Sequence, residues 1–206
     1  MLELLIEHRR SASMFAEAAA QELRAQLSRL SPLARVEPSV VWWRVKTAEA
    51  MALKLQHKGQ HANEFRSIIN DFIGFRVLSE HSGKLAAFEH AIDRWADSLE
   101  LVKFEHEETF QHPRQGVYRA IHLNYVFSDA SRFALPAVAT VEVQLTTWLD
   151  RLVSALSHDL LYKARSVDPG LAKLMQELAS RIDVADAELA PLLTNIERLL
   201  ATRETS

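Results

Sequence analysis

The chain has 206 residues, of which 48% are hydrophobic and 25% are charged, and its formal net charge is -3 at pH 7. This length suits one sizeable domain, or one domain with a helical appendage. The absence of cysteine excludes a disulfide scaffold, a thiolate zinc site and a cysteine nucleophile. The balance of charge gives no global positive field for nucleic acid. The N-terminus does not resemble a signal peptide and no run is long enough to span a membrane, so we expect a cytoplasmic protein with no membrane partner.

Periodicity and residue type predict helices and strands along the whole chain. Apolar residues at helical spacing mark the helices, and alternation or β-branched and aromatic content marks the strands. The predicted helices cover residues 3–30, 48–56, 64–69, a segment starting at Ser82, residues 147–163, and two segments between 168 and 202 that meet near Pro191. The predicted strands cover residues 40–46, 70–78, 99–108, 118–127 and 137–144.

This order predicts an α+β domain built on a mixed sheet of about five strands flanked by helices. We assign the sheet domain to residues 39–166, an N-terminal helical segment to 1–38 and C-terminal helices to 167–206. The terminal helices have apolar faces that can pack together or against a second copy, so a homo-oligomer formed through them is one expectation.

The strand predicted at 70–78 carries charges that a buried strand usually avoids. Bulky apolar residues run through it, yet it contains Asp71 and Arg76, and unpaired burial of a charge is costly. We expect both residues to lie at a cleft and to meet a ligand there. Gly74 lacks a Cβ, so a ligand or another backbone can approach closely. An internal ion pair in an ordinary strand is the alternative.

Basic residues collect where the first predicted strand ends and the next helix begins. Alternation places Arg44 and Lys46 on the same side of the strand. Thr47 is expected to cap the helix, along which Lys54 lies. Bases that converge at the start of a helix suit a polyphosphate.

Two further strands carry polar residues at a period of two. Tyr118 and His122 share one face of their strand, and Glu142 and Gln144 share one face of another. The carboxylates of Asp71 and Glu142 can together hold one Mg²⁺, which usually takes one or two carboxylates plus substrate phosphates. Taken singly, each residue also has an ordinary explanation, as a sheet aromatic, a hydrogen-bonded histidine or a surface acid.

Together, and in this order, these groups resemble the synthetase domain of the RelA/SpoT alarmone synthetases. The similar motifs are Arg44-x-Lys46-Thr47, Asp71-x-x-Gly74-x-Arg76, the run from Pro113 to His122, Glu142-x-Gln144-x-x-Thr147, and the helical segment from His158 to Lys163. The resemblance covers roughly residues 40–165, and the length is similar to that of a small, single-domain member of the family.

The resemblance implies a nucleotidyltransferase-like synthetase fold and a pyrophosphokinase, which moves the β,γ-pyrophosphate of ATP to the 3′-hydroxyl of GDP or GTP. Arg44 and Arg76 would hold the adenine of ATP, Lys46 and Lys54 would bind its phosphates, and Thr47 would also belong to the ATP site. Asp71 and Glu142 would be catalytic and would bind Mg²⁺, with Glu142 also near the attacking hydroxyl. The residues implied for the acceptor are Tyr118, His122, Gln144 and Arg114.

Two departures from the family pattern affect the acceptor side. Thr146 stands where the family usually has arginine, and Val117 stands where it usually has glycine before the tyrosine. The same transfer onto an adenosine nucleotide or onto the 3′-end of tRNA, as in toxic relatives, therefore stays open, and an antitoxin is then a candidate partner. A non-catalytic fold that senses nucleotides or binds a partner stays open as well.

Overall fold

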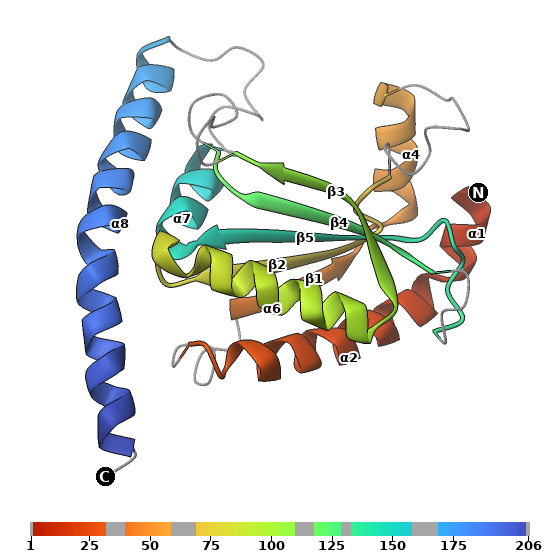
Figure 1. Ribbon diagram of the computed structural model, residues 1–206. Coiled ribbons are helices and arrows are strands. Elements are labelled where there is room, and N and C mark those ends of the chain that lie inside the picture. Colours follow the sequence, from red (N-terminus) through yellow and green to blue (C-terminus); the bar gives the residue numbers. More distant parts are fainter. Residues whose placement is uncertain are drawn as a thin grey trace.

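The computed structural model describes residues 2–31, 40–58, 69–109, 118–128, 133–157 and 169–204. Within these residues, five strands form one sheet in the order β1-β2-β5-β4-β3 (Figure 1). Strands β2 and β5 are parallel, and the other neighbours are antiparallel. The strands are β1 (Val41–Val45), β2 (Ile73–Ser79), β3 (Leu101–Glu108), β4 (Ile121–Phe127) and β5 (Thr140–Thr147). The expected α+β class and the mixed sheet of five strands are confirmed.

Helices flank this sheet. They are α1 (Leu2–Glu7), α2 (Arg9–Leu27), α4 (Ala48–Lys58), α6 (Leu85–Ser98), α7 (Trp148–Ser157) and α8 (Pro169–Glu204), and the 3₁₀ segment η3 (Ser82–Lys84) precedes α6. Figure 1 shows α2 and α6 beneath one face of the sheet, with α4 and α7 at opposite ends of the strands. No helix in the described part of the chain has the length and apolar character needed to cross a membrane.

One face of the sheet is apolar and forms the core with α2 and α6. Phe75 of β2 packs edge-on against Trp95 of α6, with ring centroids 5.2 Å apart. Phe15 of α2 packs against Phe127 of β4 at 5.1 Å. The Trp95 indole also donates a hydrogen bond of 3.0 Å to the carbonyl oxygen of Ala19, so α6 is tied directly to α2. Burial of each such ring stabilises the fold by about 1.5–3 kcal/mol. The apolar face therefore keeps the strands in place, and with them the side chains on the opposite face of the sheet.

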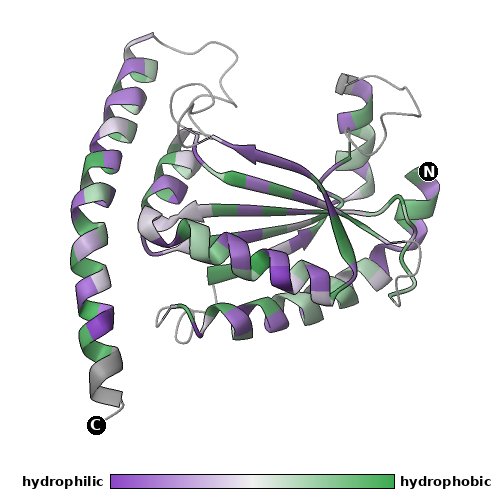
Figure 2. Cartoon of the chain, in the orientation of Figure 1, coloured by the Kyte–Doolittle hydropathy of each residue, from purple (hydrophilic) through white to green (hydrophobic). Residues whose placement is uncertain are grey.

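The opposite face of the sheet is polar because the strands alternate. Residues that lie opposite one another across neighbouring strands share a face. One such row runs through Arg44, Gly74, Glu142, Asn124 and Glu105. The next row runs through Trp42, Arg76, Gln144, His122 and Glu107. Figure 2 shows the alternation as hydrophilic and hydrophobic bands along β4 and β5.

Several element boundaries differ from those predicted. Strand β2 begins at Ile73, so Asp71 lies in the turn before it rather than in the strand. Strand β5 begins three residues later than expected because a turn, closed by a 2.8 Å bond from the amide of Ala139 to the carbonyl of Pro136, precedes it. The helix predicted at 3–30 is divided at His8, whose backbone leaves helical geometry. The helix predicted at 64–69 falls, except for its last residue, outside the described residues.

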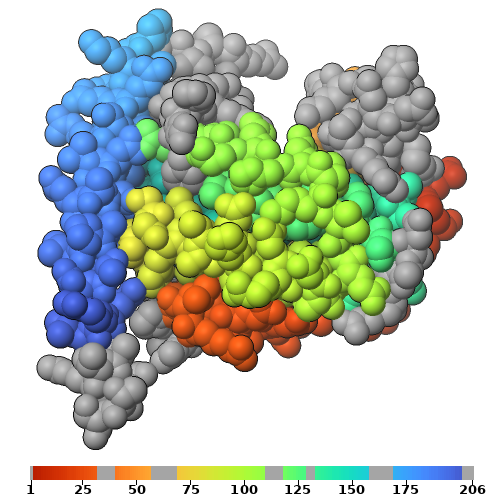
Figure 3. Space-filling model, in the orientation of Figure 1, coloured from red at the N-terminus to blue at the C-terminus, as the bar shows by residue number. Residues whose placement is uncertain are grey.

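A single helix, α8, replaces the two that were expected to meet near Pro191. Proline removes one backbone donor, which costs about 3 kcal/mol inside a helix. Here contacts on both sides of Pro191 reach the same short segment η3. Asp186 accepts a 3.0 Å hydrogen bond from the amide of Ser82, and Glu197 pairs with Lys84. These contacts hold both halves of α8 along the side of the body, as Figure 3 shows.

Candidate functional site

The polar face of the sheet contains a carboxylate surrounded by three bases. Asp71 Oδ2 accepts hydrogen bonds from Lys46 and, at 3.2 Å, from Arg44 Nη2. Its Oδ1 accepts from Lys54 Nζ at 2.8 Å, and the same ammonium donates to Asn70 Oδ1 at 2.8 Å. One negative charge therefore faces three positive charges, and this excess favours binding of a polyanion.

Local structure explains why these bases converge. The Lys46 amide donates a 2.8 Å bond to the carbonyl of Phe72, which extends the β1/β2 pairing up to Asp71. Thr47 then caps α4, since its Oγ1 accepts from the amide of Ala50 at 3.2 Å. Lys54 lies about two turns along α4 and reaches back to the carboxylate. The predicted cap and the predicted side of Lys46 are both confirmed.

The charges of this group are stabilised mutually. Burial alone would raise the pKa of Asp71, but the hydrogen bonds from Lys46 and Lys54 outweigh it and hold that pKa below its ordinary value. Burial lowers the pKa of Lys46, and the hydrogen bond to Asp71 opposes this shift. Asp71 is therefore a carboxylate at neutral pH, although only 8% of its side chain is exposed.

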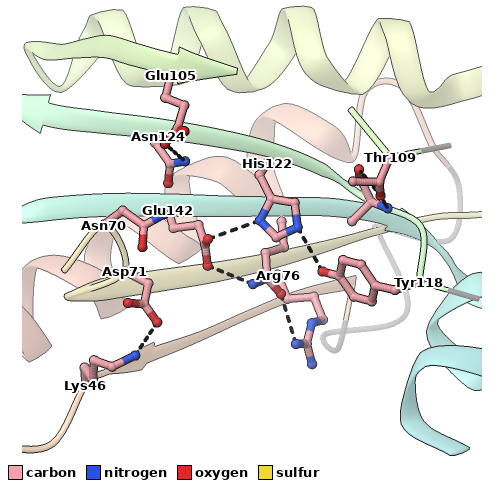
Figure 4. A network of polar contacts seen from close by, with 12 residues as sticks. Lys46, Asn70, Asp71, Arg76, Glu105, Thr109, Tyr118, His122, Asn124 and Glu142 are labelled. Atoms are coloured by element: carbon pink, nitrogen blue, oxygen red, sulfur yellow. Dashed lines mark hydrogen bonds and ion pairs between the residues drawn. The ribbon is translucent and has the colours of Figure 1, made fainter. Parts of the chain in front are cut away.

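A second group forms a chain of hydrogen bonds across β2, β5 and β4 (Figure 4). Arg76 Nη2 donates to Gln144 Oε1 at 3.1 Å, and Gln144 Nε2 donates to Glu142 Oε2 at 2.7 Å. Glu142 Oε1 lies 3.1 Å from His122 Nδ1, and His122 Nε2 lies 3.0 Å from the Tyr118 hydroxyl. If His122 Nδ1 donates to Glu142, neutral His122 accepts the Tyr118 proton at Nε2. Glu142 and Gln144 share one face of β5, as predicted, whereas Tyr118 lies before β4, which begins at Ile121 rather than at residue 118, and meets His122 from outside the strand.

Two adjoining depressions follow these groups along the sheet, and they share Arg76 and Gln144. The described residues that line the first are Trp42, Arg44, Gly74, Phe75, Arg76, Glu142 and Gln144. Those that line the second are Arg76, Tyr118, Arg119, Ala120, Gln144, Thr146, Arg151 and Ser154. The predicted guanidinium pair, Arg44 and Arg76, lines the first depression. Gly74 has no side chain, so it leaves space in the depression beneath the Arg44 side chain.

The two carboxylates proposed for a metal lie on the same side of the sheet, as Figure 4 shows. The described part of the chain contains no cluster of three or more histidine, cysteine or acidic side chains that could hold a metal ion. Asp71 and Glu142 offer hard oxygen donors, which suit Mg²⁺ only if substrate phosphates complete its coordination. The donor set thus fits Mg²⁺ bound together with a nucleotide, and this site stays a prediction.

Arg114 and Val117 lie outside the described residues, as does the segment from His158 to Lys163. Thr47 is described, but its hydroxyl is occupied as the cap of α4.

Sequence reasoning missed several residues of the site. Trp42 is half exposed, lines the first depression, and has the Arg76 guanidinium carbon 5.8 Å from its ring centroid. The period of two that paired Arg44 with Lys46 also includes Trp42 and could have found it. Arg119 and Arg151 line the second depression. The helical position of Arg151 gave no signal, because its place beside the sheet depends on how α7 leaves β5.

The sequence and the fold were compared with known proteins. The family model described as the region found in RelA / SpoT proteins matches residues 43–167, which is more than half of the chain. No curated protein matches the sequence significantly.

Several solved structures have a similar fold. A GTP pyrophosphokinase family protein from Streptococcus pneumoniae is similar with a TM-score of 0.73 at 18% identity, covering 98% of this chain and 95% of that chain. Small alarmone synthetase 1 from Bacillus subtilis, bound to its product pppGpp, gives 0.67 at 17% identity, covering 88% and 94%. The same enzyme bound to AMPCPP gives 0.61 at 15% identity, covering 89% and 94%.

At these identities the structures show a common fold, whereas the family model shows kinship of sequence. The matched segment contains Arg44, Arg76, Glu142 and His122. The chain is therefore a member of the RelA/SpoT family, with the fold of a small alarmone synthetase.

Proposed function

We propose that the protein is an ATP-dependent nucleotide 3′-pyrophosphokinase that uses GDP or GTP as acceptor and makes (p)ppGpp. The observation that carries the proposal is the juxtaposition on one sheet face of the Asp71 cluster, with its excess of positive charge, and the hydrogen-bonded carboxylate of Glu142. Membership of the RelA/SpoT family supports it, as do similar folds in proteins whose structures contain pppGpp and AMPCPP.

ATP would occupy the first depression. Its adenine would lie between Arg44 and Arg76, beside Trp42, because guanidinium planes stack well on aromatic rings. Its phosphates would compete with Asp71 for Lys46 and Lys54, which now bond that carboxylate. Asp71, released from these bases, would hold Mg²⁺ together with Glu142, and the cation supplies charge that offsets the phosphates.

The acceptor would lie on the other side of Glu142, with its base stacked on Tyr118. Its 3′-oxygen would form a bond to the β-phosphorus of ATP while the bond between that phosphorus and the α,β-bridging oxygen breaks, so AMP leaves. The 3′-hydroxyl proton would pass to Glu142, whose two oxygens are oriented by His122 and Gln144. Such transfers depend mainly on positioning and electrostatic stabilisation, which rigid strands provide.

An acceptor panel tests the proposal. The purified chain receives Mg²⁺, ATP labelled at the γ-phosphate, and GDP, GTP, ADP, ATP or deacylated tRNA in separate reactions. We expect labelled products with GDP and GTP, and none when the metal is chelated. Label on an adenosine nucleotide or on tRNA would replace the guanosine acceptor with the corresponding alternative. Absence of label with every acceptor would contradict catalysis and favour a nucleotide-sensing or partner-binding module.

A further inference from the structure

The second depression is strongly cationic. Three guanidinium groups line it, from Arg76, Arg119 and Arg151, and the described residues that line it include no carboxylate. The other described residues that line it are Tyr118, Ala120, Gln144, Thr146 and Ser154. Like charges gathered in a partly enclosed space repel one another, so an anion bound there is stabilised by all three.

The three arginines differ in how they are held. Gln144 fixes Arg76, and Asp183 of α8 pairs with Arg119. Arg119 Nε is buried and has no hydrogen-bond partner among the described residues. Arg151, on α7, makes no hydrogen bond or ion pair to any residue that the structure describes. Two of the guanidiniums are therefore positioned in advance, and the third is available to a ligand.

Burial and neighbouring charge both act on Arg76. Burial lowers the pKa of Arg76, and the charge of Arg151 acts in the same direction. Arg151 thus lies close enough to Arg76 for the two cations to interact unfavourably. Binding of an anion between them would remove this repulsion.

The depression has a defined place relative to the reacting groups. Along β5, Glu142 lines the first depression, Gln144 lines both, and Thr146 lines the second. The four residue steps from Glu142 to Thr146 span about 13 Å in an extended strand. This is comparable with the reach from the 3′-hydroxyl of a nucleotide to its terminal 5′-phosphate. The second depression also contains Tyr118, which is the expected platform for the acceptor base.

We propose that the depression lined by Arg76, Arg119 and Arg151 binds the 5′-phosphates of the acceptor, and that Arg151 makes the enzyme select a nucleoside di- or triphosphate over an acceptor with a single phosphate. This inference rests on the proposed pyrophosphokinase function. The charge of Arg151 would take the place of the arginine that the family usually has at position 146. In this chain Thr146 Oγ1 donates a 2.9 Å hydrogen bond to the carbonyl oxygen of Arg119. The positive charge comes from the next helix rather than from the strand.

The test replaces Arg151 in the full chain. The variant Arg151→Gln removes the charge, Arg151→Lys keeps it, and Arg181→Gln removes an exposed charge that pairs only within α8 among the described residues. KM and kcat are measured for GMP, GDP and GTP at saturating ATP. For Arg151→Gln we expect KM for GDP and GTP to rise by about tenfold or more, with kcat and KM for ATP within about twofold of the parent. The preference for GDP over GMP should shrink, and Arg151→Lys should recover part of it.

A binding measurement separates this inference from the proposed function. GDP is titrated calorimetrically into the parent, Arg151→Gln and Arg181→Gln proteins without ATP, and thermal unfolding confirms that each is folded. Weaker GDP binding in Arg151→Gln alone supports the phosphate site even if no acceptor is turned over. Turnover with unchanged KM values in Arg151→Gln, or a parent protein that does not bind GDP, would overturn the site. In the first of these cases the pyrophosphokinase proposal would survive.

Discussion

Glu142 Oε1 lies 3.1 Å from His122 Nδ1, and the two side chains come from neighbouring strands, β5 and β4. Gln144 Nε2 holds the other carboxylate oxygen at 2.7 Å. Both oxygens of Glu142 are thus fixed in direction, while the side chain remains at the boundary of the first depression. A carboxylate that is oriented in this way suits the acceptance of a proton from a bound hydroxyl.

We expect Glu142→Gln to lower turnover by about 10²–10⁴-fold, because an amide cannot accept the proton, while ATP still binds. Turnover of labelled ATP and the Kd for ATP are the two measurements. The matched control is Glu177→Gln, in which the same change is made at an exposed carboxylate on α8. Turnover that stays at the parent level in Glu142→Gln would refute the proton-accepting role.

Residues that share one strand face were predictable because the period of two is a local property. Arg44 and Lys46 meet at Asp71 as that period requires, whereas Tyr118 meets His122 from just outside β4. The pairing of strands is different. Gly74 lies opposite Glu142 because β2 runs parallel to β5, which joins residues far apart in the sequence. Only the resemblance to a family indicated that the residues of β2 and β5 lie side by side.

Residues placed by helix packing could not be predicted in the same way. Arg151 reaches the second depression because Thr147 ends β5 and caps α7, where the amide of Asp150 donates to Thr147 Oγ1 at 3.1 Å. The direction of α7 then decides which of its side chains face the sheet. Pro191 is a second example. Proline predicts the end of a helix from local sequence, but the contacts of α8 with η3 outweigh that preference and the helix continues.

The Asp71 cluster predicts how stability depends on pH. The pKa of Asp71 is lowered in the folded state, so the folded protein favours its charged form. This stabilisation is complete above the ordinary pKa of 3.8 and is lost as the pH falls through the lower, folded value. We therefore expect Asp71→Asn to reduce the free energy of unfolding by on the order of 1–3 kcal/mol at pH 7.

Urea unfolding at pH 7, at pH 5 and at the lowest pH where both proteins fold measures this difference. It should be constant between pH 7 and pH 5 and should shrink below pH 4. The surface variant Glu177→Gln should differ little from the parent, since exposed ion pairs contribute about 0–1 kcal/mol. A difference for Asp71→Asn that grows as the pH falls would contradict the lowered pKa.

Trp42 should contribute to ATP binding. Its ring lies beside the Arg76 guanidinium and lines the first depression, so it can support both that cation and a bound base. We expect Trp42→Ala to raise KM for ATP by roughly three- to tenfold and to leave KM for the acceptor nearly unchanged. Met14→Ala, which removes an exposed apolar side chain from α2, serves as the control. An equal effect on both substrates would show that Trp42 supports the sheet rather than the ATP site.

Helix α8 should join two copies of the chain. Its apolar residues recur with alternating spacings of four and three, as in a coiled-coil seam, at Leu171, Met175, Leu178, Ile182, Ala185, Leu189, Leu192, Ile196 and Leu199. Met175 is buried against α7, whereas Leu192 and Ile196 are 58% and 52% exposed. The same seam therefore continues from an internal helix contact onto an open surface. Leu193 and Leu200, which flank its exposed end, are uncharged and extend its apolar surface.

Light scattering during size-exclusion chromatography tests this association. We expect the parent chain to be a dimer or a larger assembly and Ile196→Glu to be a monomer, because the new carboxylate would be buried unpaired in the seam. Val184→Glu places the same charge on an exposed part of α8 outside the repeat and should leave the assembly intact. Because Asp183 of α8 pairs with Arg119 at the second depression, we also expect acceptor KM to differ between Ile196→Glu and the parent. A monomeric parent, or equal dissociation by both substitutions, would rule out this seam as the contact between copies.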